Sequence, residues 1–153
     1  MPTDAFRLAR VATFDAGLEV ETFRTSGTTG GARGTHAMRV LETYHAAAMA
    51  GANATLFAPF GARARVIALA PSAQEARDSS LSRMLEWFVA ERGDERSTFV
   101  RPDDVDRALD VIERAALDGP LLLLATAFAW VHLIDRLAGR SLPLTPGSRA
   151  MQT

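Results

Sequence analysis

The chain contains the stretch Leu-Leu-Leu-Leu-Ala-Thr at residues 121–126. It is short, apolar up to its last residue and preceded by Asp-Gly-Pro, as is typical of a central strand in a parallel sheet that is covered on both faces. The apolar character continues to Ile134, but this longer run is too short for a bilayer core and contains His132. We therefore predict a strand that leads into a helix, and no membrane span.

The rest of the chain alternates between strand and helix patterns in the same way. Expected strands cover residues 19–25, 64–70 and 97–100; expected helices begin at Thr35, at Ser79 or Ser80 and at Asp103 or Asp104, and another covers 128–137. Ser, Thr and Asp at these starts can cap the first turn. The alternation predicts an α/β fold with a mostly parallel sheet flanked by helices, in one domain over residues 1–153.

The composition is that of a globular protein and excludes several functional classes. The chain has 153 residues, of which 48% are hydrophobic and 23% charged, and a formal net charge of -1. No nucleic acid or anionic membrane partner is expected from that charge. The chain has no cysteine, which excludes disulfides and a thiol nucleophile within it. It shows no signal-peptide pattern, so we expect a cytoplasmic protein. The absence of a Gly-x-Ser-x-Gly sequence argues against a hydrolase.

The most glycine-rich part of the chain is the loop between Phe23 and Thr35. Glycines at positions 27, 30, 31 and 34 are interspersed with Ser and Thr residues, and Arg33 adds a positive charge. Successive backbone N–H groups in such a loop can form a nest for an anion, and the hydroxyls add donors. The composition points to a loop that holds nucleotide phosphates, with a flexible surface turn as the alternative.

The segments on either side of this loop favour the phosphate interpretation. Met38, Leu41, Tyr44 and Ala48 fall at helical spacing, which predicts a helix that Thr35 can cap. The positive end of its dipole would then lie beside the loop. The loop is not a Walker-type phosphate loop, because Arg33 follows Ala32 and no lysine lies nearby.

The order of residues in the loop matches a known pattern. Residues 25–34, Thr-Ser-Gly-Thr-Thr-Gly-Gly-Ala-Arg-Gly, resemble the phosphate loop of the adenylate-forming ligases, Ser/Thr-Ser-Gly-Thr-Thr-Gly-x-Pro-Lys-Gly. Positions 25–30 match fully, whereas Ala32 and Arg33 stand where the family usually has Pro and Lys. Further stretches look like the acyl-protein synthetase (LuxE-type) branch of these ligases: residues 70–71, 78–84, 125–133, 142–143 and 147–153.

The resemblance implies an enzyme that activates a carboxylic acid, typically a fatty acid, as its acyl-adenylate, using ATP and Mg²⁺, for transfer to a thiol. The residues that would hold the ATP phosphates are Thr25, Ser26, Gly27, Thr28, Thr29, Gly30, Gly31, Arg33 and Gly34. Thr126 ends a strand and would form a wall of the nucleotide or acyl pocket, or else bond only to the following turn. His36 would contact a phosphate or the substrate, or else serve as an ordinary helix-start residue.

The resemblance also implies that the chain is a partial copy of the family's catalytic core. The acyl-accepting cysteine is absent, so the acceptor thiol would lie on another segment or protein. Met1 would be an internal or shortened start, and the later nucleotide contacts would follow Thr153. Two interpretations stay open: a fragment of an enzyme, and a catalytically dead binding module or remnant. An interrupted sheet would expose apolar surface and favour self-association.

The remaining polar residues form no metal-binding pattern. His36, His45 and His132 are widely spaced and lack a Cys or His-x-x-x-His partner, so no metal site made by the protein alone is predicted. Asp78 and the two serines after it look first like a helix cap, with a functional role as the alternative.

Overall fold

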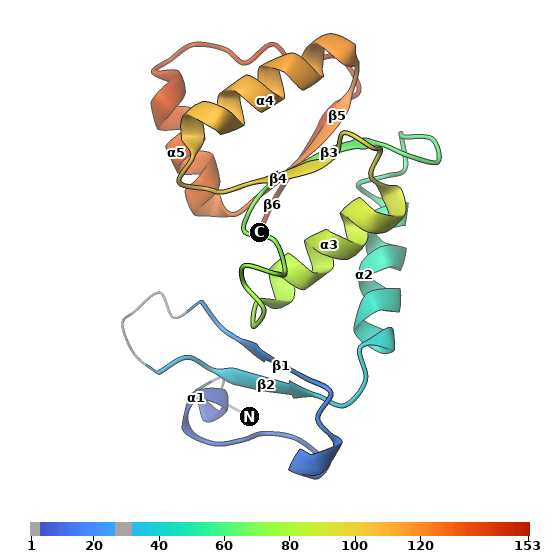
Figure 1. Ribbon diagram of the computed structural model, residues 1–153, viewed down its shortest axis with the longest axis vertical. Coiled ribbons are helices and arrows are strands. Elements are labelled where there is room, and N and C mark those ends of the chain that lie inside the picture. The colour runs from blue at the N-terminus through green and yellow to red at the C-terminus, as the bar shows by residue number, and fades with distance from the viewer. Residues whose placement is uncertain (1–3, 27–31) are drawn as a thin grey trace.

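The computed structural model describes residues 4–26 and 32–153 (Figure 1). The elements in chain order are α1 (Ala5–Leu8), a 3-10 turn (Ala16–Leu18), β1 (Glu21–Arg24), β2 (Thr35–Met38), α2 (Glu42–Ala54), β3 (Arg65–Leu69), α3 (Ser80–Arg92), β4 (Thr98–Val100), α4 (Val105–Asp118), β5 (Leu121–Ala125), α5 (Ala127–Leu137) and β6 (Arg149–Gln152).

The strands form two separate sheets. β3, β4, β5 and β6 make a parallel sheet in the order β4-β3-β5-β6, and β1 and β2 make an antiparallel hairpin. Helices α4 and α5 cover one face of the parallel sheet, and α2 and α3 lie on the other side (Figure 1). The predicted α/β class with a mostly parallel sheet flanked by helices is confirmed.

Strand β5 is the centre of the core, as its sequence predicts. All five of its residues are buried, and it pairs with β3 on one side and β6 on the other. Leu121 and Leu123 pack with α4 and α5, whereas Leu122 and Leu124 pack with α2 and α3. A strand covered on both faces needs apolar residues at every position, and each buried leucine stabilises the fold by about 1.5–3 kcal/mol.

The connections between the parallel strands reverse direction once. The connection through α3 carries the chain from β3 to β4 on one side, and the connection through α4 then carries it to β5 on the other side of β3. The topological switch point therefore lies between the adjacent strands β3 and β5. In open α/β sheets, ligands bind beyond the carboxyl ends of the strands at this place.

Most helix starts agree with the sequence-based expectation. Ser79, Asp104 and Thr126 each cap a helix through the side chain, which accepts a hydrogen bond from a first-turn backbone N–H. These bonds satisfy donors that have no partner within the helix.

One predicted helix start is wrong. Thr35–Met38 does not open a helix but forms strand β2, and α2 begins only at Glu42. The reason is pairing with β1, where Phe23 lies opposite His36 and Arg24 opposite Thr35. The hairpin ladder satisfies these backbone groups, so the weak helical spacing of Met38, Leu41 and Tyr44 does not decide the conformation.

Candidate functional site

The two ends of the glycine-rich loop are hydrogen-bonded to each other where the loop joins strands β1 and β2, and we call this place the mouth of the hairpin. Thr25 N–H donates to Gly34 O at 2.9 Å, and Gly34 N–H donates to Thr25 Oγ1 at 2.9 Å. A Cβ at Gly34 would lie 3.2 Å from Thr25 Cγ2 and 3.6 Å from Phe6 Cβ, so this position is closely packed. Thr25 and Gly34 thus fix both ends of the segment between them. The predicted phosphate ligands Gly27, Thr28, Thr29, Gly30 and Gly31 lie outside the described residues.

Arg33 lies against the same end of the hairpin. Its Nε donates to Thr25 O at 2.6 Å and its Nη2 donates to Arg24 O at 3.3 Å. Its Nη1 donates to Asp78 Oδ2 at 2.7 Å, in an ion pair that is partly exposed. The guanidinium therefore joins the end of β1 to a third segment.

That third segment is the connection from β3 to α3. Asp78 O accepts a hydrogen bond from Arg24 N–H at 2.8 Å, in addition to the side-chain contact with Arg33. Further along, Arg83 forms an ion pair with Glu21 of β1 at 3.1 Å. Because this connection leaves the carboxyl end of β3, it ties the hairpin to the edge of the sheet where α/β proteins bind ligands.

Thr126 follows the carboxyl end of β5, on the other side of the switch point. Its Oγ1 accepts a hydrogen bond from Ala129 N–H at 3.2 Å and so caps α5. The neighbouring backbone is tied to the end of β6, since Ala127 N–H donates to Thr153 O at 3.2 Å. The structural role of Thr126 is thus a helix cap, and the same residue stands at the ligand-binding edge of the sheet.

His36 lies in β2 rather than at a helix start. Its ring stacks on Phe6, with 4.3 Å between the ring centroids. It also lines a pocket of about 350 Å³ together with Phe23, Thr25, Met38 and Tyr44. Burial raises the pKa of the Tyr44 hydroxyl, although its hydrogen bond with Ser80 lowers it in part. The pocket is thus a mostly aromatic and apolar hollow directly beside the hairpin mouth.

The structure brings four of the predicted site residues together: Thr25, Arg33, Gly34 and His36. The expectation that a helix N-terminus lies beside the loop is wrong, because β2 separates them and α2 begins at the opposite end of the hairpin (Figure 1). Sequence reasoning missed Asp78 as the partner of Arg33. The two residues are 45 positions apart, and the only local signal, an acidic residue before Ser-Ser, resembles an ordinary cap.

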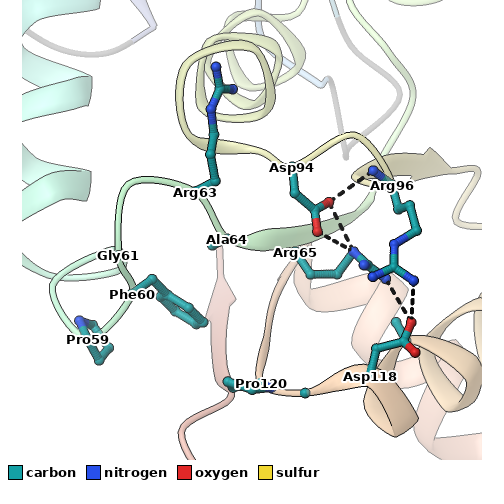
Figure 2. Close-up of a pocket in the computed structure, with 12 residues that line it drawn as sticks. Pro59, Phe60, Gly61, Arg63, Ala64, Arg65, Asp94, Arg96, Asp118 and Pro120 are labelled. Atoms are coloured by element: carbon teal, nitrogen blue, oxygen red, sulfur yellow. Dashed lines mark hydrogen bonds and ion pairs between the residues drawn. The ribbon is translucent and has the colours of Figure 1, made fainter.

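A second cavity, of about 320 Å³, lies at the opposite edge of the parallel sheet (Figure 2). Arg65 Nε donates to both carboxylate oxygens of Asp94, at 3.0 and 2.8 Å, while Arg96 pairs with Asp118 at 2.7 Å. Arg63 donates to Gly93 O at the end of α3, at 2.8 Å. The charges here already have partners, and helices α3 and α4 both end at this edge. We therefore assign this network to the stability of the fold.

No group of three or more His, Asp or Glu side chains in residues 4–26 and 32–153 is arranged to hold a metal ion. Mg²⁺ in nucleotide sites commonly binds through substrate phosphates, water and one or two carboxylates. The described helices include none with the length and hydrophobicity needed to cross a membrane.

No family model, curated protein or solved structure matches the chain significantly.

Proposed function

We propose that the β1–β2 hairpin is the ATP-phosphate loop of an adenylate-forming acid ligase of the acyl-protein synthetase type. In this reaction a carboxylate oxygen of the acid attacks the α-phosphate of ATP, the bond to the β-phosphate breaks, and pyrophosphate leaves. The acyl-adenylate would then pass its acyl group to a thiol outside this chain. Residues 25–34 would hold the β- and γ-phosphates while negative charge develops on the leaving group.

The observation that carries this proposal is the joining of Thr25 to Gly34, next to Arg33 and Asp78. The family-like pattern covers residues 25–34, and the two ends of that stretch are joined by two hydrogen bonds of 2.9 Å each. Asp78 connects the hairpin to the carboxyl end of β3, close in the chain to the switch point. A phosphate loop needs fixed ends, because preorganised donors stabilise developing charge without reorganising.

The described residues at the loop entrance would each make a different contribution to binding the phosphates. Thr25 and Ser26 supply hydroxyls at the loop entrance, and Arg33 supplies the positive charge. Mg²⁺ would bridge the phosphates and neutralise part of their charge, with its remaining ligands from water. The pocket lined by Phe23, Met38 and Tyr44 offers apolar surface beside the same entrance.

One observation favours a second candidate, an interaction module without catalysis. Every guanidinium nitrogen of Arg33 already has an acceptor: two carbonyls of β1 and its extension, and the Asp78 carboxylate. Arg33 in this position is a structural cross-link rather than a free phosphate ligand. In the enzyme, a phosphate oxygen would have to replace the longest of these contacts, the one to Arg24 O at 3.3 Å, while the contact with Asp78 remains.

The first test is the substitution Gly30→Val. A side chain at a glycine of a phosphate loop blocks the close approach of the backbone to an anion. We expect this variant to lose ATP binding, measured by titration calorimetry with Mg²⁺, while its urea unfolding remains cooperative.

Gly61→Val is the matched control, since a Cβ at Gly61 meets no atom within 4 Å and the position is remote from the hairpin. It should bind ATP as the unmodified chain does. Equal ATP affinity in the Gly30 and Gly61 variants would contradict the loop assignment.

A further inference from the structure

Asp78 contacts the β1–β2 hairpin through both its backbone and its side chain. Its carbonyl oxygen accepts from Arg24 N–H at 2.8 Å, and its carboxylate accepts from Arg33 Nη1 at 2.7 Å. Asp78 therefore binds β1 through its backbone and binds Arg33, near the end of the loop, through its side chain. Thr25 and Gly34 directly follow in the chain the two residues that Asp78 contacts, Arg24 and Arg33.

Asp78 also lies on a firmly anchored segment. The next residue, Ser79, caps α3 by accepting from Ser82 N–H at 3.1 Å. Ser80 O accepts from the Tyr44 hydroxyl at 3.0 Å, which links the same turn to α2. Asp78 is therefore held by the parallel-sheet part of the molecule, and whatever it contacts is positioned relative to the carboxyl edge of that sheet.

We propose that Asp78 is a positioning residue: its carboxylate holds Arg33 against the hairpin and so keeps the joined residues Thr25 and Gly34 in place beside the connection from β3 to α3. This inference rests on the proposed function. Asp78 touches no reacting group in it and acts only through Arg33. Ser79 caps α3 without help from Asp78. The role of the Asp78 side chain can therefore be tested without removing this cap.

The test removes the charge of Asp78 and keeps its backbone contact. Asp78→Asn retains the carbonyl that accepts from Arg24, but its neutral amide is a much weaker partner for a guanidinium. Because the lost ion pair is partly exposed, the unfolding midpoint should change little. We expect amide hydrogen exchange at Thr25 and Gly34, followed by NMR without ligand, to become several-fold faster.

ATP affinity is the second readout. We expect Asp78→Asn to weaken Mg²⁺-ATP binding by about tenfold, within the range found for directly coupled residues. Arg33→Met should weaken it as well, and the double variant should be no weaker than Arg33→Met alone, because Asp78 acts through Arg33. Independent, additive losses from the two substitutions would show that Asp78 does not act through Arg33 and would contradict the proposal.

Asp106→Asn is the matched control, since Asp106 accepts from Arg136 Nε at 2.7 Å in another exposed ion pair, between α4 and α5. It should alter neither the exchange at Thr25 and Gly34 nor the ATP affinity. Unchanged exchange in Asp78→Asn, or faster exchange with full ATP affinity, would overturn the proposal. If the unmodified chain binds no ATP, the proposed function fails, and the exchange data alone decide whether Asp78 positions the hairpin.

Discussion

Gly93 shows how a single backbone position is constrained at the end of α3. Its φ of -72° is open to any residue, yet an added Cβ would lie 2.4 Å from Val89 O and 2.9 Å from Ser97 Oγ. Glycine often ends a helix in a left-handed conformation, but at Gly93 the structure shows that close approach is the reason.

We expect Gly93→Ala to lower the free energy of unfolding by about 1–3 kcal/mol, as is usual when atoms are forced into a closely packed place. Urea denaturation measures this directly. Gly61→Ala, at a site with no atom within 4 Å of the added carbon, should change stability by less than about 0.5 kcal/mol. Equal effects of the two substitutions would show that the contacts around Gly93 yield easily.

Arg33 marks the limit of sequence reasoning at the residue scale. Its charge and its place in the loop pattern predict a phosphate ligand, and that role stays a prediction. Its contacts with Thr25 O and Asp78 could not be predicted, because they depend on a hairpin and on a segment 45 residues away. The spacing of residues within a short stretch of sequence carries no information about such a long-range contact.

At the scale of elements, the sequence predicts the buried strands of the parallel sheet and misses β2 and β6, which are half-buried or exposed. β5 is apolar and buried throughout, and β3 is apolar and buried after Arg65, so their composition alone identifies them. β6 is mostly exposed, and its sequence Arg-Ala-Met-Gln carries no strand pattern. It forms because β5 offers a free edge, with Leu122 opposite Arg149 and Leu124 opposite Met151. β2 is missed for the same reason, since it is fixed by pairing with β1.

Helix α5 provides a prediction about capping. Thr126 Oγ1 is the only side-chain acceptor that the structure gives to the first turn of α5 in the described chain. Thr126→Ala should therefore lower the free energy of unfolding by about 1 kcal/mol, and Thr126→Ser, which keeps the hydroxyl, should lower it much less. Chemical denaturation of the two variants makes the comparison.

The same pair of variants separates the two roles of Thr126. If Thr126 also lines the nucleotide or acyl pocket, the alanine variant will bind Mg²⁺-ATP more weakly than the serine variant at a temperature where both are folded. Equal ATP affinity would leave Thr126 as a helix cap alone. Equal stability of the alanine and serine variants would contradict the capping role.

At the scale of the whole molecule, the alternation of strands and helices is enough to predict the parallel sheet. It does not predict the strand order or the place of the hairpin, because both depend on long-range contacts. The structure adds that the two sheets are joined at the carboxyl edge of the parallel one, through Asp78 and through the pair Arg83–Glu21. The candidate site therefore depends on the tertiary arrangement as much as on the loop sequence.

The network at the opposite edge makes the stability of the molecule depend on pH. Burial acts to raise the pKa of Asp94, but hydrogen bonds from Arg65, Ser97 and Arg96 N–H, with the charge of Arg65, outweigh it and leave the pKa below its usual value. A carboxyl group with a lowered pKa stabilises the fold fully above its unfolded pKa of about 3.9, and this stabilisation is lost as the pH falls through the lower folded value.

Asp94→Asn should therefore be less stable than the unmodified chain at pH 7, by about 1–3 kcal/mol for a lost partner of a largely buried guanidinium. The difference should shrink when the pH falls below about 4, because the Asp94 carboxyl then takes up a proton in the unfolded chain before it does so in the folded one. Urea unfolding at a series of pH values measures both effects. A difference that stays constant down to pH 2 would contradict the role given to Asp94.

The binding of phosphates by the whole chain is the most direct test of the central claim. Thermal melting should be recorded with no ligand, with Mg²⁺-ATP, with Mg²⁺-pyrophosphate and with adenosine. A ligand that binds only the folded state adds about 2.7 kcal/mol at a hundredfold excess over its dissociation constant, which corresponds to roughly 5–10 °C for a chain of this size. We predict a cooperative melt that shifts upward with ATP and pyrophosphate but not with adenosine. A cooperative melt that none of these ligands shifts would contradict the assignment of the hairpin as a phosphate loop.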